Sequence, residues 1–365
     1  MNANLHFVAT ARFEAACRLP MLADGHPSQG LHGHSYLARV RARPEAGWGG
    51  FVGAEAEMLA NTLRDSVAPL NYADLNLHLP IPTDENLARW LLSRLRAVPG
   101  LANVGVQSTA EQGADLDGED HAHIWRRFRF EAAHQLPNVP PGHQCGRMHG
   151  HGFEVILHAD QDLAGGDMGV DLDYLAECWA PLQRQLHYQC LNDIAGLENP
   201  TSEMLCEWIW RQLKPGLSEL SWVTVYETAT AGCHYDGRHF RIWKEMRFES
   251  ALRLRHAPDG DRRAQLHGHS YLLRLHLTAP LDRVMGWTVD YGEVKSLFTP
   301  IYKDLDHRRL DEMPRLADAD VGSVLHWMRR RCQAELPQLD RIDLMQTPAC
   351  GAVLSWGEHG PALPS

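Results

Sequence analysis

Three copies of the tripeptide His-Gly-His carry most of the potential chemistry of this sequence, and they begin at His32, His149 and His267. In each copy, polar and apolar residues alternate after the tripeptide, which is typical of a β-strand with one buried face. Side chains at positions i and i+2 of a strand point to the same side of the sheet. The two imidazoles of each tripeptide can therefore bind one cation.

The second copy has the fullest set of potential ligands. His134 ends an earlier strand-like segment, so across a hairpin it would meet His149 and His151. Three neutral imidazoles with one open position are typical of a catalytic zinc site. An isolated His-x-His pair is more often a surface pair, but the third histidine and the nearby Cys145 favour a metal. We predict Zn²⁺ as the cofactor, with His134, His149 and His151 as its ligands.

The other two copies have weaker ligand sets. At the position of His134 the first copy has Cys17 and the third has Leu252. A leucine cannot bind a metal. Cys17 could bind zinc with His32 and His34, but we expect it to be a structural remnant, with only the second copy holding metal firmly.

The spacing of the tripeptides, 117 and 118 residues, divides the chain into three tandem repeats. We place repeat 1 at 1–118, repeat 2 at 119–243 and repeat 3 at 244–365. Periodicity within each repeat predicts an α+β unit of order β-β-α-α-β-β, with Asp171 and Asp290 as helix N-caps. Such a small sheet leaves exposed edges, which joining the units would remove. We therefore predict an intramolecular pseudo-trimer around an antiparallel β-barrel.

Composition limits the classes of partner. The formal net charge of −11 argues against nucleic acid as the main partner, because phosphate binding needs clustered Lys and Arg. No stretch approaches the roughly 18 apolar residues of a membrane span, and we expect no membrane contact and no signal peptide. Eight cysteines without a CxxC pair fit reduced thiols. We expect a cytoplasmic protein.

The segment from about 124 to 243 resembles a complete member of the 6-pyruvoyl-tetrahydropterin synthase family. The resemblance rests on "FEAAHQLP", "GHQCGRMHGH", "LNDIAGLENPTSE" and "ETATAGC", and the Cys-x3-His-x-His spacing is that of the 6-carboxy-5,6,7,8-tetrahydropterin synthases of queuosine biosynthesis. It implies the tunnelling fold, in which three subunits surround a barrel and trimers stack in pairs. One chain would then be a trimer made covalent, and two chains would form a homodimer of pseudo-trimers.

The resemblance also implies a substrate and roles. Members of this branch convert 7,8-dihydroneopterin triphosphate and release acetaldehyde and triphosphate; zinc binds side-chain hydroxyls and a cysteine, here Cys145, moves a proton. Glu227 would hold the amino-pyrimidine edge of the pterin, since a carboxylate accepts two parallel hydrogen bonds. Thr201, Ser202 and Glu203 match a segment that approaches the pterin, although Thr or Ser followed by Glu is also an ordinary helix start.

The family's Asp-His pair is displaced in this chain. Repeat 2 has His187 and Tyr188 at its position, whereas repeat 3 has Asp306 and His307. Repeat 3 in turn has Arg263 in place of the cysteine. In the family the active site lies between neighbouring subunits, so we predict one lyase site per chain, built from repeats 2 and 3, if repeat 3 faces the zinc ligands. If repeat 1 faces them instead, this prediction fails. The alternative for Asp306 and His307 themselves is that they only cap a helix or form a salt bridge.

Positive charge near Cys145 should favour its thiolate form. We expect Arg147, His143 and the metal to lower the pKa of Cys145, while the role of His143 itself is undecided.

The same zinc site could convert another pterin, as a pyruvoyl-tetrahydropterin synthase does. A non-catalytic pterin- or zinc-binding scaffold is the third possibility, and intact Cys145, Asp306 and His307 speak against it.

Overall fold

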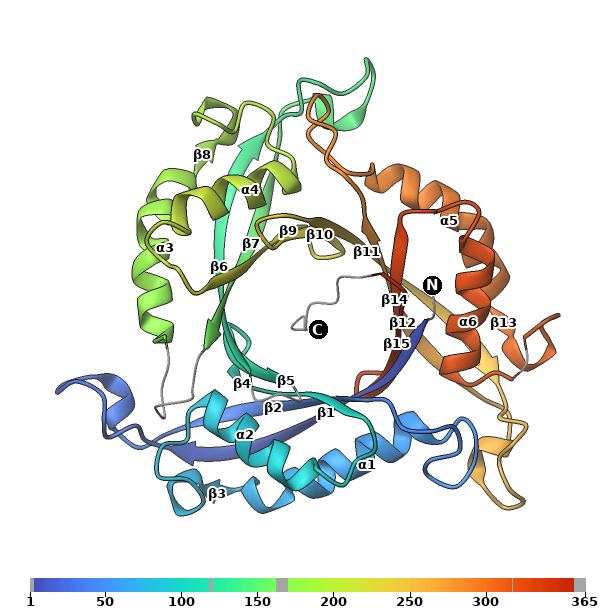
Figure 1. Cartoon of the computed structure of the whole chain (residues 1–365). Helices are drawn as coiled ribbons and strands as arrows, with labels where there is room; N and C mark the ends of the chain where they lie inside the picture. Colours follow the sequence, from blue (N-terminus) through green and yellow to red (C-terminus); the bar gives the residue numbers. More distant parts are fainter. Residues whose placement is uncertain (1–2, 118–120, 162–169, 317, 358–365) are drawn as a thin grey trace.

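The strands of the computed structural model join into one sheet that closes on itself (Figure 1). The structure describes residues 3–117, 121–161, 170–316 and 318–357. The elements of repeat 1 are β1 (Asn4–Cys17), β2 (His32–Ala42), α1 (Glu55–Val67), β3 (Ala73–Asp74), α2 (Asp84–Leu95), β4 (Leu101–Thr109) and β5 (Gln112–Asp117). Those of repeat 2 are β6 (Ala122–His134), β7 (His149–Gln161), α3 (Leu172–Leu186), β8 (Gln189–Cys190), α4 (Ser202–Leu213), β9 (Leu220–Thr228) and β10 (Ala231–Tyr235). Those of repeat 3 are β11 (Phe240–Leu252), β12 (His267–Thr278), α5 (Tyr291–Leu305), β13 (Arg308–Arg309), α6 (Val321–Cys332), β14 (Leu339–Thr347) and β15 (Cys350–Ser355).

The predicted order β-β-α-α-β-β is confirmed in all three repeats, with one addition. The two-residue strands β3, β8 and β13 pair in parallel with the first strand of their own repeat. The predicted N-caps are confirmed too, since Asp171 accepts from the amide of Asp173 and Asp290 from that of Glu293, both at 2.9 Å. The expected boundary near 244 falls inside β11.

Three seams join the repeats into a ring. Strand β5 pairs with β6, β10 pairs with β11, and β15 pairs with β1, all antiparallel. Among the described residues there are 15 strands, and without the short β3, β8 and β13 the remaining 12 form the closed barrel. The predicted pseudo-trimer around an antiparallel barrel is confirmed, and closure leaves these strands without open edges.

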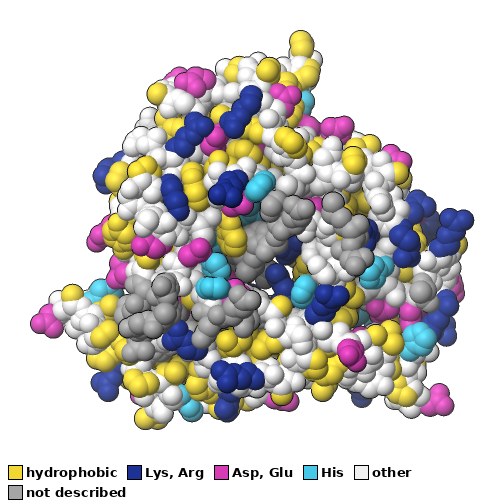
Figure 2. Space-filling model, in the orientation of Figure 1, with side chains coloured by type: hydrophobic (Ala, Val, Ile, Leu, Met, Phe, Trp, Pro, Cys, Tyr) yellow, Lys and Arg dark blue, Asp and Glu magenta, His cyan; other side chains and the backbone are white. Residues whose placement is uncertain are grey.

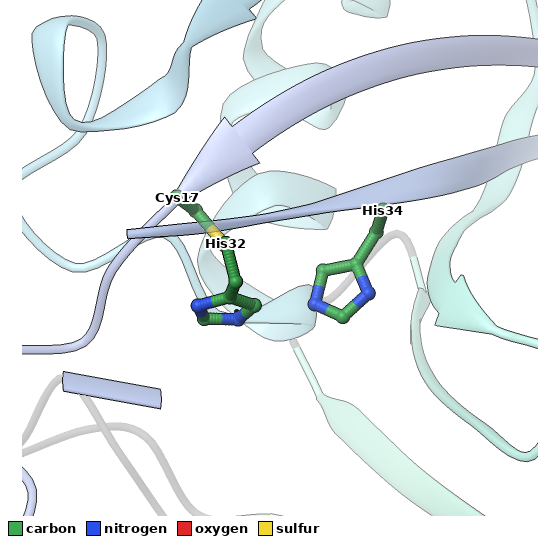
Figure 3. Close-up of side chains that lie close together, drawn as sticks. All are labelled: Cys17, His32 and His34. Carbon is green, nitrogen blue, oxygen red and sulfur yellow. Dashed lines mark hydrogen bonds between the residues drawn. The ribbon is translucent and has the colours of Figure 1, made fainter. Parts of the chain in front are cut away.

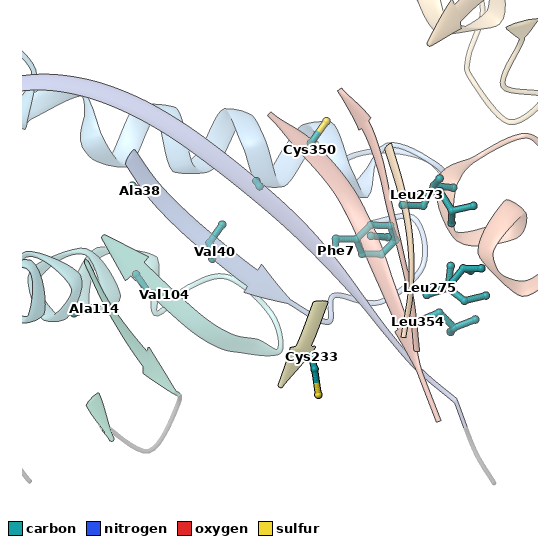
Figure 4. Packing of buried hydrophobic residues seen from close by; sticks show 14 of the residues in the cluster. Phe7, Ala38, Val40, Val104, Ala114, Cys233, Leu273, Leu275, Cys350 and Leu354 are labelled. Carbon is teal, nitrogen blue, oxygen red and sulfur yellow. The ribbon is translucent and has the colours of Figure 1, made fainter. Parts of the chain in front are cut away.

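The helices lie outside the barrel and cover its outer face (Figure 1). In α3 the buried residues Leu175, Trp179, Leu182 and Leu186 recur every three or four positions, so they form one face against the sheet. Burying each such side chain stabilises the fold by about 1.5–3 kcal/mol. Residues from all three repeats join one buried cluster, part of which is drawn in Figure 4. No helix in the described part of the chain is both long and apolar enough to cross a membrane.

The inner face of the barrel is charged. In β2, Arg39 and Arg41 alternate with the core residues Ala38 and Val40 and therefore point the opposite way, into the barrel. They line an internal cavity together with Arg341 and others. Figure 2 shows Lys, Arg and His side chains around the hollow near the centre of one face.

Candidate metal centre and active site

The three predicted zinc ligands of repeat 2 lie together at one end of the β6–β7 hairpin. His134 pairs directly with His149 across the two strands, and His151 is two residues further along β7. One ring nitrogen from each of the three imidazoles lies within 4.8 Å of the other two. Strand pairing and the i, i+2 rule are sufficient to position all three.

The surrounding groups orient these rings for a metal. Nδ1 of His134 donates to the carbonyl of Pro200 (2.9 Å) and Nδ1 of His149 to that of Arg147 (2.8 Å), so Nε2 of each ring is left as an acceptor. Nε2 of His134 and of His151 are buried and have no hydrogen-bond partner within the described residues. Burial lowers the pKa of both rings, which keeps them neutral, as metal binding requires. The donor set therefore fits Zn²⁺.

A carboxylate from β9 stands beside the histidines. Oε2 of Glu227 accepts a hydrogen bond from the hydroxyl of Ser202 (2.6 Å), and Oε1 lies 3.6 Å from Nε2 of His151. Ser202 therefore fixes one carboxylate oxygen. The other faces the histidine cluster and the cavity beside it.

A cavity of about 280 Å³ opens next to this cluster and is shared by two repeats. Repeat 2 contributes Cys145, His149, His151 and Glu227 to its walls, and repeat 3 contributes the segment from Trp287 to Gly292. Among the described residues that line this cavity, repeat 3, and not repeat 1, faces the histidine cluster of repeat 2. This arrangement could not be read from the sequence.

Cys145 lies in a short 3-10 turn, Gln144–Gly146, at the cavity wall. Its amide donates to Nδ1 of His143 (3.2 Å), and Nε2 of the same ring lies 3.3 Å from Oδ2 of Asp290 in repeat 3. His143 therefore connects the thiol-bearing turn to the neighbouring repeat. This contact gives His143 a positioning role that sequence reasoning left undecided.

The protein groups around the thiol raise its pKa. Burial is the largest cause, and the carboxylates of Glu227 and Asp290 add to it. The expectation that neighbouring positive charge lowers the pKa of Cys145 is therefore not met by the protein alone. A cation bound by the three histidines would act in the opposite direction, since positive charge favours the thiolate.

The residues Thr201, Ser202 and Glu203 form the first turn of α4 and also line the cavity. Thr201 caps the helix by accepting from the amide of Met204 (3.2 Å), and its hydroxyl donates to the carbonyl of Gly286. Glu203 accepts from both the amide and the hydroxyl of Thr288, at 2.7 and 3.0 Å. Burial raises the pKa of Glu203 to about 7. The segment therefore both starts helix α4 and forms part of the cavity wall.

Asp306 and His307 lie at a different place. Oδ2 of Asp306 is 2.9 Å from Nδ1 of His307, whose side chain is 77% exposed. With Glu249, His269 and neighbouring residues, His307 lines an open hollow on the surface of repeat 3. Neither Asp306 nor His307 is among the described residues that line the cavity beside Cys145.

The turn that carries this pair has the same geometry in every repeat. His307 has a positive φ of 56°, and its amide donates to the carbonyl of Glu249 (2.6 Å). Asp306 accepts from the amide of Glu249 (3.0 Å). Tyr72 and Tyr188 repeat the positive φ at the equivalent positions. The contact of Asp306 with the amide of Glu249 therefore stabilises this turn, whatever the role of Asp306 in catalysis. Repeat 3 has an imidazole, His307, where repeats 1 and 2 have the tyrosines Tyr72 and Tyr188.

Several residues of the cavity wall could not be found from the sequence. Asp290 was predicted only as an N-cap, and Trp287, Tyr291 and Lys244 were not singled out. They line the cavity because barrel closure brings repeat 3 there, and no local pattern carries that information.

A closed antiparallel barrel of three α+β repeats, with a histidine cluster beside a seam between repeats, defines a tunnelling-fold protein. A sequence profile of the family described as 6-pyruvoyl tetrahydropterin synthase matches residues 7–119, 123–238 and 241–356. The chain belongs to this family and contains three copies of its domain.

Each of the following relatives aligns with a stretch of this chain about as long as one repeat. A 6-carboxy-5,6,7,8-tetrahydropterin synthase from Synechocystis sp. is 38% identical over 119 residues, which are 31% of this chain and 91% of the relative. A dihydroneopterin monophosphate aldolase from Pyrococcus furiosus is 25% identical over 119 residues, 32% of this chain and 97% of the relative. The solved 6-pyruvoyl tetrahydropterin synthase of Caenorhabditis elegans is 19% identical, covering 31% of this chain and 92% of its own, with a TM-score of 0.29.

Proposed function

We propose that the chain is a zinc-dependent 6-carboxy-5,6,7,8-tetrahydropterin synthase, a carbon–carbon lyase with one active site per chain at the seam between repeats 2 and 3. It would convert 7,8-dihydroneopterin triphosphate and one water to 6-carboxytetrahydropterin, acetaldehyde and triphosphate, as in queuosine biosynthesis. The observation that carries the proposal is the meeting of Cys145, the three-histidine cluster and Glu227 in one cavity. The 38% identity to a 6-carboxy-5,6,7,8-tetrahydropterin synthase supports this choice of branch.

The residues around the cavity divide the work. His134, His149 and His151 would hold the zinc, which when bound acts as a Lewis acid on substrate hydroxyl oxygens. Cys145 serves as the base that moves a proton at the carbon next to the ring. Glu227, fixed by Ser202, accepts from the two donors on the amino-pyrimidine edge of the pterin. Thr201 and Glu203 shape the wall on the same side.

Asp306 and His307 are assigned to the site of a second chain in this proposal. The exposed ring of His307 and the open hollow around it are suited to a contact between two pseudo-trimers. In a two-fold dimer each chain would deliver its Asp-His pair to the Cys145 of the other. The proposal therefore includes a homodimer.

Product analysis is the direct test of the reaction. The zinc-loaded full chain is incubated with 7,8-dihydroneopterin triphosphate, and acetaldehyde and the pterin product are followed by chromatography. We expect both products. A pterin product without acetaldehyde would assign the site to a pyruvoyl- or aldolase-type reaction, and binding without turnover would mean a scaffold.

Mixed dimers test the placement of the Asp-His pair. Cys145→Ala and His307→Ala are each expected to lose about a hundredfold or more in turnover, the scale of an acid/base residue. When the two variants are co-expressed, about half of the dimers are mixed, and each mixed dimer has one complete site out of two. Up to about one quarter of wild-type activity should therefore return. If His307 acted on the Cys145 of its own chain, no activity would return.

A further inference from the structure

We propose that Cys17, His32 and His34 form a second metal site, in repeat 1, and that this site binds Zn²⁺ through one thiolate and two imidazoles. The inference concerns a different repeat from the proposed active site and does not depend on the reaction assigned there. It revises the expectation that Cys17 is only a structural remnant.

The backbone brings these three side chains together as it does in repeat 2. Cys17 pairs directly with His32 across β1 and β2, and His34 is two residues further along β2. Figure 3 shows the rings of His32 and His34 next to each other on the same side of the strand, with the sulfur of Cys17 near the point where the His32 side chain leaves the strand. One donor atom from each residue lies within 4.8 Å of the other two.

The separation of sulfur and nitrogen matches a shared metal. Sγ of Cys17 is 3.7 Å from Nε2 of His32. Zinc bonds of about 2.3 Å to sulfur and about 2.05 Å to nitrogen, at a tetrahedral angle, put these two atoms about 3.6 Å apart. The Cys17–His32 pair therefore needs little rearrangement to share a metal.

Two further contacts prepare the donors. Nδ1 of His32 donates to the carbonyl of Gly30 (2.8 Å), so its Nε2 is the free acceptor, as in His149 of repeat 2. Burial raises the pKa of the Cys17 thiol, and the hydroxyl of Tyr36, which donates to Sγ (3.2 Å), acts in the opposite direction. Tyr36 is itself fixed by stacking on Phe13, with ring centroids 4.8 Å apart.

The donor set selects the kind of metal. A thiolate with two imidazoles favours Zn²⁺ over Mg²⁺ and Ca²⁺, which prefer oxygen ligands. The structure has no disulfide at Cys17, which is only 3% exposed. Access to the donors is from the side of the two histidines, which are partly exposed.

The chemistry around this second site is different from that in repeat 2. Ser28 occupies the position of Cys145 and Gln107 that of Glu227. Neither a thiol base nor a carboxylate anchor is therefore provided, and the metal would act structurally. It would tie the end of β1 to the start of β2, close to the contact between His26 and Asp173 (2.8 Å) that joins repeat 1 to repeat 2.

Counting metal in the full chain tests the proposal. The protein is stripped with a chelator, reloaded with zinc, freed of excess metal and analysed by mass spectrometry of the element. We expect two zinc ions per wild-type chain and one in either Cys17→Ala or His149→Ala. One zinc in the wild type that Cys17→Ala retains, or two in Cys17→Ala, would overturn the proposal. His34→Ala repeats the test if Cys17→Ala fails to fold.

Cobalt substitution shows which sulfur binds the metal. Co²⁺ bound to a thiolate gives a near-ultraviolet charge-transfer band that Co²⁺ bound only to imidazoles lacks. We expect the band in wild type, in His149→Ala and in Cys145→Ser, and its loss in Cys17→Ser. A band that depends on Cys145 and not on Cys17 would assign the sulfur ligand to repeat 2 and contradict the proposal. Neither readout uses turnover, so failure here is separate from failure of the lyase assignment.

Discussion

Repeats 1 and 2 present the same backbone geometry with different donors. In both, the end of one strand meets the start of the next, and two histidines lie on one face. Repeat 2 adds a third imidazole, a thiol on a nearby turn and a carboxylate held by Ser202, whereas repeat 1 adds a buried thiol at the ligand position itself. The strand pairing therefore brings potential metal ligands together in both repeats. The other side chains nearby determine whether the site also has a thiol and a carboxylate for a reaction.

Repeat 3 extends this comparison to a third outcome. Leu252 pairs with His267 where the other repeats have Cys17 or His134, so the third donor is missing. The same repeat supplies the wall segment around Asp290 to the cavity of repeat 2. A repeat without a third donor of its own therefore still contributes to the cavity of its neighbour.

The largest expected difference between repeats 1 and 2 is in turnover. Cys145→Ala removes the proposed base, and we expect a loss of about a hundredfold to ten-thousandfold in kcat. Ser28→Ala changes the equivalent turn of repeat 1 and should leave kcat unchanged. Steady-state acetaldehyde release measures both. Equal effects of the two substitutions would contradict the assignment of the chemistry to repeat 2.

The second difference is in the pH dependence of stability. Burial raises the pKa of Glu203 to about 7, so the folded state holds this proton more tightly than the unfolded chain does. The free energy of unfolding should therefore fall as the pH rises from about 4.5 to about 7, by about 3 kcal/mol for this group. Glu203→Gln should remove this fall, because its amide oxygen can still accept from Thr288.

Urea unfolding between pH 4.5 and 8 measures this contribution as the difference between wild type and Glu203→Gln. In repeat 1, burial raises the pKa of Asp84 to about 8, so Asp84→Asn should remove a larger fall that continues to about pH 8. Parallel pH curves for the wild type and Glu203→Gln would mean that the pKa of Glu203 is the same in the folded and unfolded states.

A third comparison concerns the anchoring of the substrate. Glu227→Gln replaces one of the two acceptor oxygens by a donor, and we expect KM to rise about tenfold or more, the size of one lost hydrogen bond to a charged group. Gln107→Glu makes the opposite change in repeat 1 and should not alter KM. A fluorescence titration with a pterin measures the binding directly. A wild-type affinity in Glu227→Gln would remove Glu227 from the substrate contacts.

The smallest expected effect is on the contacts between repeats. His143 meets Asp290 at the seam of repeats 2 and 3, and His26 meets Asp173 at the seam of repeats 1 and 2. Asp290→Asn and Asp173→Asn should each change the free energy of unfolding by less than about 1 kcal/mol, as for other exposed or partly exposed pairs. Only Asp290→Asn should also lower kcat, because His143 positions the turn of Cys145. Equal kcat values in the two variants would contradict this positioning role.

The sequence predicts the fold and the three-histidine cluster because both depend on local patterns. Alternation gives the strands, the i, i+2 rule brings His149 and His151 together, and a hairpin adds His134. The number of repeats follows from their spacing. These inferences need no knowledge of which strands close the barrel.

The rest depends on contacts between distant parts of the chain. Asp290 and Trp287 reach Cys145 only because β10 pairs with β11 and repeat 3 follows repeat 2 around the ring. The raised pKa of Cys145 results from burial and from carboxylates of two repeats, so the basic residues near it in sequence did not predict it. The position of His307, away from that cavity, likewise follows from the three-dimensional arrangement of turns.

The pairing of β15 with β1 also has a consequence for how the chain folds. It joins Asn4 to Ser355, residues at nearly opposite ends of the sequence, and is thus the least local contact in the barrel. During synthesis, the hairpins of repeats 1 and 2 can form before β15 has been made. Until then, one edge of β1 has no strand to pair with. Ring closure is therefore expected to be the late and slow step of folding, and the step at which nascent chains are most exposed to aggregation.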